Sequence, residues 1–300
     1  MSAELKEVRQ RIGSTRQIRR VTSTLQRVAA ARGRRDRQAL ERAERYRAAL
    51  WEVLSGLAAA APEAGHPLLS APRGGAPCLI AFGADRGLCG GFSTLLAEEL
   101  ERQRARRAPA PVRLAAVGRV VQRRARRAGW PLEAALRQPV PAHAARRAAP
   151  GGAEPAGEAE LRRLVEGAVG RFLAGEYSEV VLVYVRFEAG MRQKPAAERL
   201  LPLALAAPPR SPLRLAELEP GAETLLERLL PEYLWQAARC AFLHSLAAEN
   251  AARQVAMSRA TENAGELLEE LIMQYRRVRQ DSITTEMIEL CSGRLEVRRN

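Results

Sequence analysis

Proline is absent from two long stretches of the chain, the residues before Pro62 and those after Pro231. Because proline breaks or kinks a helix, these are the stretches where an uninterrupted helix can form. Aromatic residues make up only 4% of the 300 residues, which favours long alanine-rich helices over a bulky all-β core. The absence of proline from both ends and the scarcity of aromatic residues predict a chain with a long helix at each end.

Cysteines and long apolar runs are also scarce. Cys78, Cys89, Cys240 and Cys291 lie far apart and form no CxxC motif, so we expect reduced thiols, no disulfide framework and no zinc site. No stretch approaches the ~18 consecutive apolar residues of a membrane span, and no apolar signal segment precedes the first predicted helix. We therefore expect a chain that is neither secreted nor membrane-spanning and that reaches a membrane only through partners.

Lysine is almost missing, yet the chain is strongly basic. Only Lys6 and Lys194 are lysines, and arginine gives a formal net charge of +14 and a pI near 10.8. Such a charge suits a nucleic-acid-binding protein, and it equally suits a protein that sits against acidic partners. Two arginine-rich runs, 102–107 and 119–127, have apolar residues interleaved at helical spacing. These runs are predicted to be solvated helix faces, with contact to anionic lipid or acidic neighbours as the alternative.

The last seventy residues, from about Glu232 to Asn300, are predicted to form one helix. Small and apolar residues recur there at steps of three and four, as in the series Leu234, Ala237, Ala241 and Ser245. At 1.5 Å per residue this helix would be ~100 Å long, which no compact core can cover. It needs a long partner helix, and its narrow seam of small residues allows close approach.

Residues 3–57 supply that partner. Leu5, Val8, Ile12 and Thr15 alternate by three and four, as coiled-coil seam positions do, and the segment would give a helix of ~80 Å. Gly33 is predicted to interrupt it. Because the two helices lie at opposite ends of the chain, we expect an antiparallel pair that brings together the two ends of a middle domain.

The middle of the chain has α/β character. Short apolar runs predict buried strands, and amphipathic segments between them predict helices. Their alternation implies a parallel, partly doubly wound sheet of Rossmann-like type. The predicted domains are 1–60, 76–206 and 222–300, with a flexible linker or loop at 139–157. The predicted strands are 78–82, 112–117 and 180–187, and the predicted helices are 93–107, 120–128 and 158–174.

A glycine-rich loop, DRGLCGG at 85–91, follows the first predicted strand. Glycines at the start of a helix can bind phosphate, but this loop is neither GxGxxG nor GxxxxGK[ST]. Cys89 has no evident histidine partner for nucleophilic catalysis, because His66, His143 and His244 lie in unrelated segments. A tight turn that needs glycine dihedrals is the plainer interpretation.

Several segments resemble the gamma subunit of F-type rotary ATP synthases. The C-terminal helix carries ARQVAMSRATENAGEL at 252–267 and YRRVRQDSITTE at 275–286, the N-terminal helix carries KEVRQRI and VAAAR, and the loop carries DRGLCGG. The chain departs from the family pattern where Leu25 and Arg27 stand in place of methionines, and where Ala84 replaces a serine or threonine. The resemblance covers about two thirds of the chain and is weakest from Pro109 to Pro155.

The resemblance implies a non-catalytic rotor shaft without cofactor or metal, with an antiparallel coiled coil of the terminal helices. Its expected partners are the alpha and beta subunits of the catalytic ring, the c-subunit ring and the epsilon subunit. The expected location is the cytoplasmic side of a bacterial cell membrane. The residues implied in contact with the beta subunit are Arg253, Gln280, Thr284 and Glu286, those of a neck loop are Asp85, Arg86 and Cys89, and those facing the c ring and epsilon are Ser211, Leu213, Arg214 and Glu217.

Two other functions remain open from the residues alone. One is a basic coiled-coil protein that binds nucleic acid, which salt-sensitive binding to random DNA would favour. The other is a small Rossmann-like nucleotide enzyme with helical extensions, which tight binding of a dinucleotide would favour.

Overall fold

The computed structural model describes residues 3–60, 66–72, 74–141, 156–188, 192–205 and 221–297. The chain divides into two compact units: Met1–Ala29 with Gln254–Asn300, and Ala30–Arg253. Helix α1 (Ala3–Ala60) and helix α5 (Ala222–Val297) each contribute residues to both units. Within the part of the chain that is described, no helix is long and apolar enough to cross a membrane.

The unit formed by both chain ends is a helix pair. Val8 and Ile12 of α1 form a small apolar cluster with Leu268 and Leu271 of α5. Farther along α1, the Thr22 hydroxyl accepts a hydrogen bond from Thr261 (2.8 Å). Because the partner number falls as the number in α1 rises, the two helices run antiparallel, and the predicted antiparallel pair is confirmed.

Each long helix contains a residue that the sequence placed at a break: Gly33 was expected to interrupt the first helix, and Pro231 to precede the last one. Gly33 lies inside α1, so the predicted interruption is wrong: a Cβ added there would lie 3.5 Å from the Asn250 Cβ, an ordinary contact distance, so the helix continues through the glycine without a clash or a special backbone conformation. Helix α5 begins at Ala222, so Pro231 lies inside the helix and does not precede it. The lost backbone hydrogen bond is tolerated because Leu230 and Leu234 beside the proline are fully buried.

A five-stranded sheet forms the centre of the other unit. Its strands are β1 (Ala76–Phe82), β2 (Arg113–Val117), β3 (Leu132–Leu136), β4 (Tyr177–Phe187) and β5 (Gln193–Leu201). The order is β3-β2-β1-β4-β5, with parallel pairing throughout except for the antiparallel β4–β5 pair. The predicted parallel sheet is confirmed, while β3 and β5 are not among the strands predicted from apolar runs. The β3 run LEAAL is short and rich in alanine, a helix former, and β5 carries charged residues and a proline.

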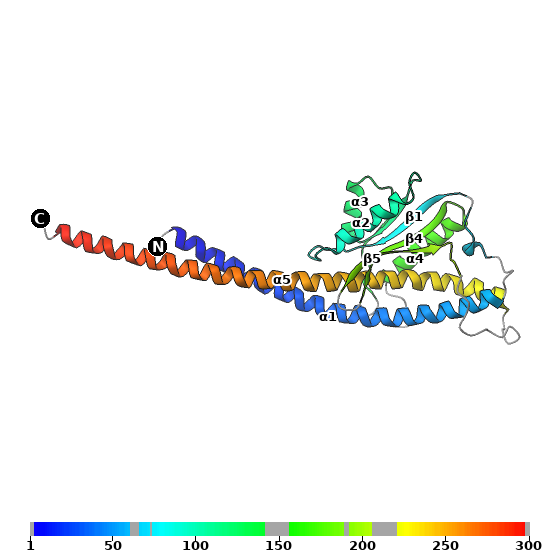
Figure 1. Ribbon diagram of the computed structural model, residues 1–300, viewed down its shortest axis with the longest axis horizontal. Coiled ribbons are helices and arrows are strands. Elements are labelled where there is room, and N and C mark those ends of the chain that lie inside the picture. Colours follow the sequence, from blue (N-terminus) through cyan, green and yellow to red (C-terminus); the bar gives the residue numbers. More distant parts are fainter. Residues whose placement is uncertain are drawn as a thin grey trace. The chain divides into compact units, whose positions relative to one another are not determined.

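Helices cover both faces of this sheet, as a doubly wound fold requires. Helices α2 (Phe92–Ala105) and α3 (Arg119–Arg127) lie on one side, as Figure 1 shows, and share a core with Leu79 and Ala81 of β1. The alternate residues Cys78, Ile80 and Phe82 face a second core with α4 (Ala156–Leu173), α1 and α5. A short 3-10 helix, η1 (Pro67–Leu69), precedes β1.

Candidate functional site

The glycine-rich loop lies where β1 and β2 end, at the carboxyl edge of the parallel sheet. Two glycines fit this corner for different reasons. Gly90 has a φ of +52°, and Gly118 has a φ of +102° and would place a Cβ 2.3 Å from the carbonyl oxygen of Gly83. The plainer interpretation, a tight turn that needs glycine, accounts for this geometry.

Asp85 organises the neighbouring backbone. Its Oδ1 accepts hydrogen bonds from the backbone N–H groups of Arg119 (3.0 Å) and Gln138 (3.1 Å), and its Oδ2 lies 3.8 Å from Arg119 Nε. Asp85 therefore joins the loop to the first residue of α3 and to the segment after β3. The carboxylate is already used within the chain.

Cys89 is a buried structural residue. Its Sγ lies 3.8 Å from the Arg86 carbonyl oxygen and 3.7 Å from Ser93 Oγ, and it is only 3% exposed. Among the described residues, no group of three or more histidine, cysteine or acidic side chains is arranged to hold a metal ion.

Polar side chains of α5 are bonded to the same edge of the sheet. Ser245 Oγ donates to the Phe82 carbonyl oxygen (2.8 Å) and accepts from the Val185 backbone N–H (3.3 Å). One turn later, the buried Glu249 accepts a hydrogen bond from Gln138 Nε2 (2.6 Å). Hydrogen bonds that bridge elements in this way fix the helix against the end of the sheet more specifically than apolar contact does.

Arg253 completes this network. Its Nη2 lies 2.6 Å from Glu249 Oε1 and 3.4 Å from the carbonyl oxygens of Arg86 and Gly87, and its side chain is 15% exposed. Its neighbour Asn250 donates to Asp36 of α1 (2.6 Å). The structure thus brings Asp85, Arg86 and Arg253, three residues singled out from the sequence, into one polar network of two helices and the loop.

The other predicted contact residues of α5 lie in the helix-pair unit and are exposed. The Thr284 hydroxyl donates to the Gln280 carbonyl oxygen (2.9 Å), and the side chains of Gln280 and Glu286 make no hydrogen bond or ion pair with a described residue. They are available to a partner. Ser211, Leu213, Arg214 and Glu217 lie outside the described residues.

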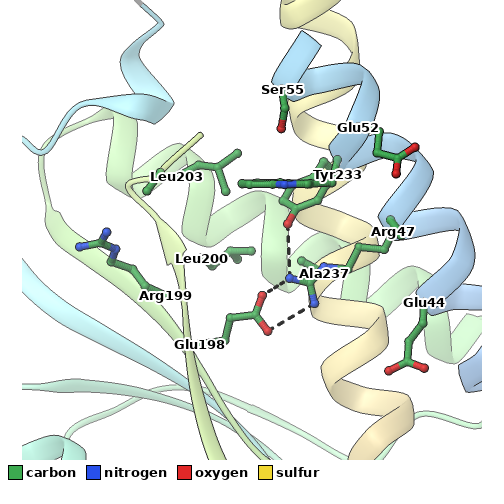
Figure 2. A pocket seen from close by; sticks show the side chains of 13 residues that line it. Glu44, Arg47, Glu52, Ser55, Glu198, Arg199, Leu200, Leu203, Tyr233 and Ala237 are labelled. Carbon is green, nitrogen blue, oxygen red and sulfur yellow. Dashed lines mark hydrogen bonds and ion pairs between the residues drawn. The ribbon is translucent and has the colours of Figure 1, made fainter. Parts of the chain in front are cut away.

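Sequence reasoning missed a second polar centre, between α1, β5 and α5. Arg47 pairs with Glu198 through Nη1 and Nη2, and its Nη2 also lies 3.3 Å from the Tyr233 hydroxyl (Figure 2). Burial, the largest single effect, would lower the pKa of Arg47, but the Glu198 carboxylate and the Tyr233 hydroxyl together outweigh it and hold this pKa above its ordinary value. These residues lie 151 and 186 positions from Arg47, and no motif connects them.

The hydrogen bonds of Ser245, Glu249 and Arg253 join α5 to the rim of the α/β domain. A helix bonded to the rim of a folded domain cannot turn without that domain, because each rotation would break several short hydrogen bonds.

Comparison with known proteins agrees with the resemblance found in the sequence. The chain matches the ATP synthase family over residues 4–295. It is 33% identical over 293 residues to the ATP synthase gamma chain of Ruegeria pomeroyi, a match that covers 96% of this chain and 98% of that one. It is 35% identical over 303 residues to the ATP synthase gamma chain of Phenylobacterium zucineum, covering 97% of this chain and 98% of that one.

Solved structures show the same fold at low sequence identity. A chain from the mitochondrial ATP synthase of Euglena gracilis, in a structure of its F1 and c-ring parts, matches with a TM-score of 0.63 and 15% identity, covering 97% of this chain and 93% of that chain. A chain from the central stalk and c ring of the Tetrahymena thermophila enzyme matches with a TM-score of 0.56 and 18% identity, covering 80% and 99%. The gamma-chain relatives and the family match favour the rotor-shaft interpretation over the nucleic-acid-binding one.

Proposed function

We propose that this chain, which belongs to the ATP synthase gamma-chain family and is a central rotor shaft, couples ion flow through a membrane ring to ATP synthesis and hydrolysis without performing chemistry itself. The observation that carries the proposal is the match along nearly the whole length of bacterial gamma chains, supported by a helix pair of the expected polarity. ATP chemistry then belongs to the partners.

The coupling follows from population shifts in the catalytic ring. A shaft is asymmetric, so it presents different faces to each of several identical catalytic subunits in turn. A face that fits one subunit conformation better than another shifts that subunit toward the first, and with it the nucleotide affinity. The polar network of Ser245, Glu249 and Arg253 supports this role, because it joins α5 to the α/β domain and so lets torque pass between them.

The partners we propose are the alpha and beta subunits, the c ring and the epsilon subunit, at the cytoplasmic side of a bacterial membrane. The similar Euglena gracilis chain comes from a structure of F1 and c-ring parts, and the similar Tetrahymena thermophila chain from one of the central stalk and c ring, which supports the alpha and beta subunits and the c ring as partners of this chain. Arg253, Gln280, Thr284 and Glu286 are proposed to face a loop of the beta subunit, and Ser211, Leu213, Arg214 and Glu217 to face the c ring and epsilon. Cysteines placed within 211–220 should crosslink to those two partners, and crosslinks to alpha and beta alone would contradict the second assignment.

Co-expression tests the proposal as a whole. The chain should co-purify with alpha and beta subunits from the same genome in a complex that hydrolyses ATP. Omission of the chain should leave alpha and beta without cooperative, rotation-coupled turnover. An equally active complex assembled without this chain would refute the rotor-shaft role for it.

A further inference from the structure

A pocket of about 840 Å³ opens beside the Arg47–Glu198 pair, and nothing in a shaft's work requires it. Its walls come from α1, β5 with the residues after it, and α5, all in the unit Ala30–Arg253 (Figure 2). Its volume lies in the range of small-molecule sites, which is ~300–1,000 Å³.

One wall of the pocket is apolar and aromatic. The rings of Trp51 and Tyr233 lie 5.3 Å apart between centroids, and Leu200 and Leu203 also line the pocket. The protein has only three tryptophans and five tyrosines, so an aromatic pair at a pocket wall is notable in this chain. Electron-rich ring faces attract alkyl groups and organic cations.

The charges at the pocket are unevenly matched. Arg47 is committed to Glu198, and Figure 2 shows the guanidinium of Arg199 directed away from the other lining side chains. Glu44 and Glu52 of α1 also line the pocket. Glu44 contacts His244 (3.0 Å), whereas Glu52 is exposed and makes no ion pair with a described residue. The α1 side of the pocket therefore offers carboxylates to a cation.

A buried hydroxyl provides a second, independent indication of a ligand. Ser55 is 4% exposed and lines the pocket, and its Oγ is buried without a hydrogen-bond partner in the described part of the chain. A buried hydroxyl without a partner destabilises the fold, and a ligand N–H would remove that cost by donating to it. Ser55 stands one helical turn from Glu52, so one ammonium group can reach both.

We propose that this pocket binds a linear polyamine. Glu44 and Glu52 lie eight positions apart on α1, a rise of ~12 Å. Two ammonium groups held at that separation would meet one carboxylate each, while the methylenes between them lie along Trp51, because the guanidinium of Arg47 already lies 5.6 Å from the centroid of the Tyr233 ring. The ammonium at Glu52 would also donate to Ser55 Oγ. In a chain of net charge +14, a free cation is repelled from most of the surface, so its binding requires a local acidic site such as this one.

Calorimetric titration of the full chain with amines of graded length tests the geometry. Spermidine and 1,8-diaminooctane, whose extended lengths approach the Glu44–Glu52 rise, should bind saturably, with dissociation constants of ~0.1–1 mM. Octylamine, with one charge, and 1,4-diaminobutane, which is too short, should each bind at least ~3-fold more weakly. Equal affinity for the short and long diamines, or no saturable binding by any of them, would overturn the proposal.

Variants locate the site. Glu52→Gln should weaken spermidine binding ~3-fold and Glu44→Gln with Glu52→Gln ~10-fold, while Glu41→Gln, an exposed α1 carboxylate outside the pocket, should leave it unchanged. Ser55→Ala should weaken binding without changing the length preference. If Glu41→Gln weakens binding as much as Glu52→Gln, the attraction belongs to the general surface and the proposal fails. Because the diamine series uses the unaltered chain, a variant that does not fold leaves the test intact.

Discussion

At the scale of single residues, Arg253 is held by the chain's own groups rather than extended freely toward a partner. It faces Glu249 and two loop carbonyl oxygens, and Glu249 is itself buried. Arg253→Ala would leave that carboxylate with Gln138 alone, so we expect the free energy of unfolding to fall by ~2–3 kcal/mol. Denaturant unfolding of the isolated chain measures the change.

The matched control is Gln280→Ala, because the Gln280 side chain is exposed and bonded to no described residue. This variant should change stability by less than ~0.5 kcal/mol. Arg253→Lys should recover only part of the loss, since an ammonium lacks the planar fork that reaches the carboxylate and the carbonyl oxygens together. Equal stability of Arg253→Ala and the unaltered chain would show that the network contributes nothing to the fold.

Burial also governs the thiols. It raises the pKa of Cys78 to about 12 and that of Cys240 to about 11, because a thiolate is poorly solvated there. At pH 8 both should stay protonated and react with iodoacetamide far more slowly than a free thiol, and unfolding in urea should restore ordinary reactivity. Mass spectrometry of the labelled peptides checks this, and rapid native labelling of Cys78 would contradict the buried position.

The sequence allowed some of these residues to be anticipated and not others. Asp85 and Arg86 belong to a recognisable glycine-rich motif, and Arg253 belongs to a second motif that resembles the same family. Arg47, Glu198 and Tyr233 belong to no such motif. They come together only in the folded chain, and their contact cannot be predicted from a single sequence.

At the scale of elements, periodicity predicted the long helices and most strands, because helix and strand place side chains with different repeats. It failed where a residue's local preference was overridden. Helix α5 continues through Pro231 because the neighbouring side chains are buried. Strand β3 forms from alanine-rich residues because its backbone pairs with the edge of β2. Neither effect is local, so neither was visible in a window of sequence.

Gly33 provides a prediction at this scale. Glycine inside a helix costs ~0.5–1 kcal/mol relative to alanine, and the added Cβ would make an ordinary contact of 3.5 Å with Asn250. Gly33→Ala should therefore raise the free energy of unfolding by up to ~1 kcal/mol, seen as a higher midpoint in thermal unfolding. Gly33→Leu should lower it, because a larger side chain would push α5 away from α1.

A destabilised Gly33→Ala chain would mean that α1 and α5 tolerate no added atom at this point. Gly13→Ala is the matched control for helix propensity alone, because a Cβ there meets nothing within 4 Å.

At the scale of the whole molecule, agreement between distant parts carried the assignment. Sequence motifs in both terminal helices and in the central loop resemble one family, and the match over residues 4–295 confirms that family. The division into two units that each take part of α1 and α5 was not predictable, because helical periodicity continues unchanged across the boundary.

The last prediction concerns torque in the assembled complex. If Arg253 and Gln280 contact a beta-subunit loop, removal of either side chain should slow ATP turnover several-fold while nucleotide binding by the beta subunits stays largely intact, because the shaft biases conformations and does not touch nucleotide. Gln280→Ala is the cleaner test, since its exposed side chain plays no part in the fold. Arg253→Ala alters the loop network too, so slow turnover there with normal turnover in Gln280→Ala would assign the defect to the Glu249 network rather than to a beta contact. Unchanged synthesis and hydrolysis by both variants, in complexes shown to be fully assembled, would remove these residues from the coupling mechanism.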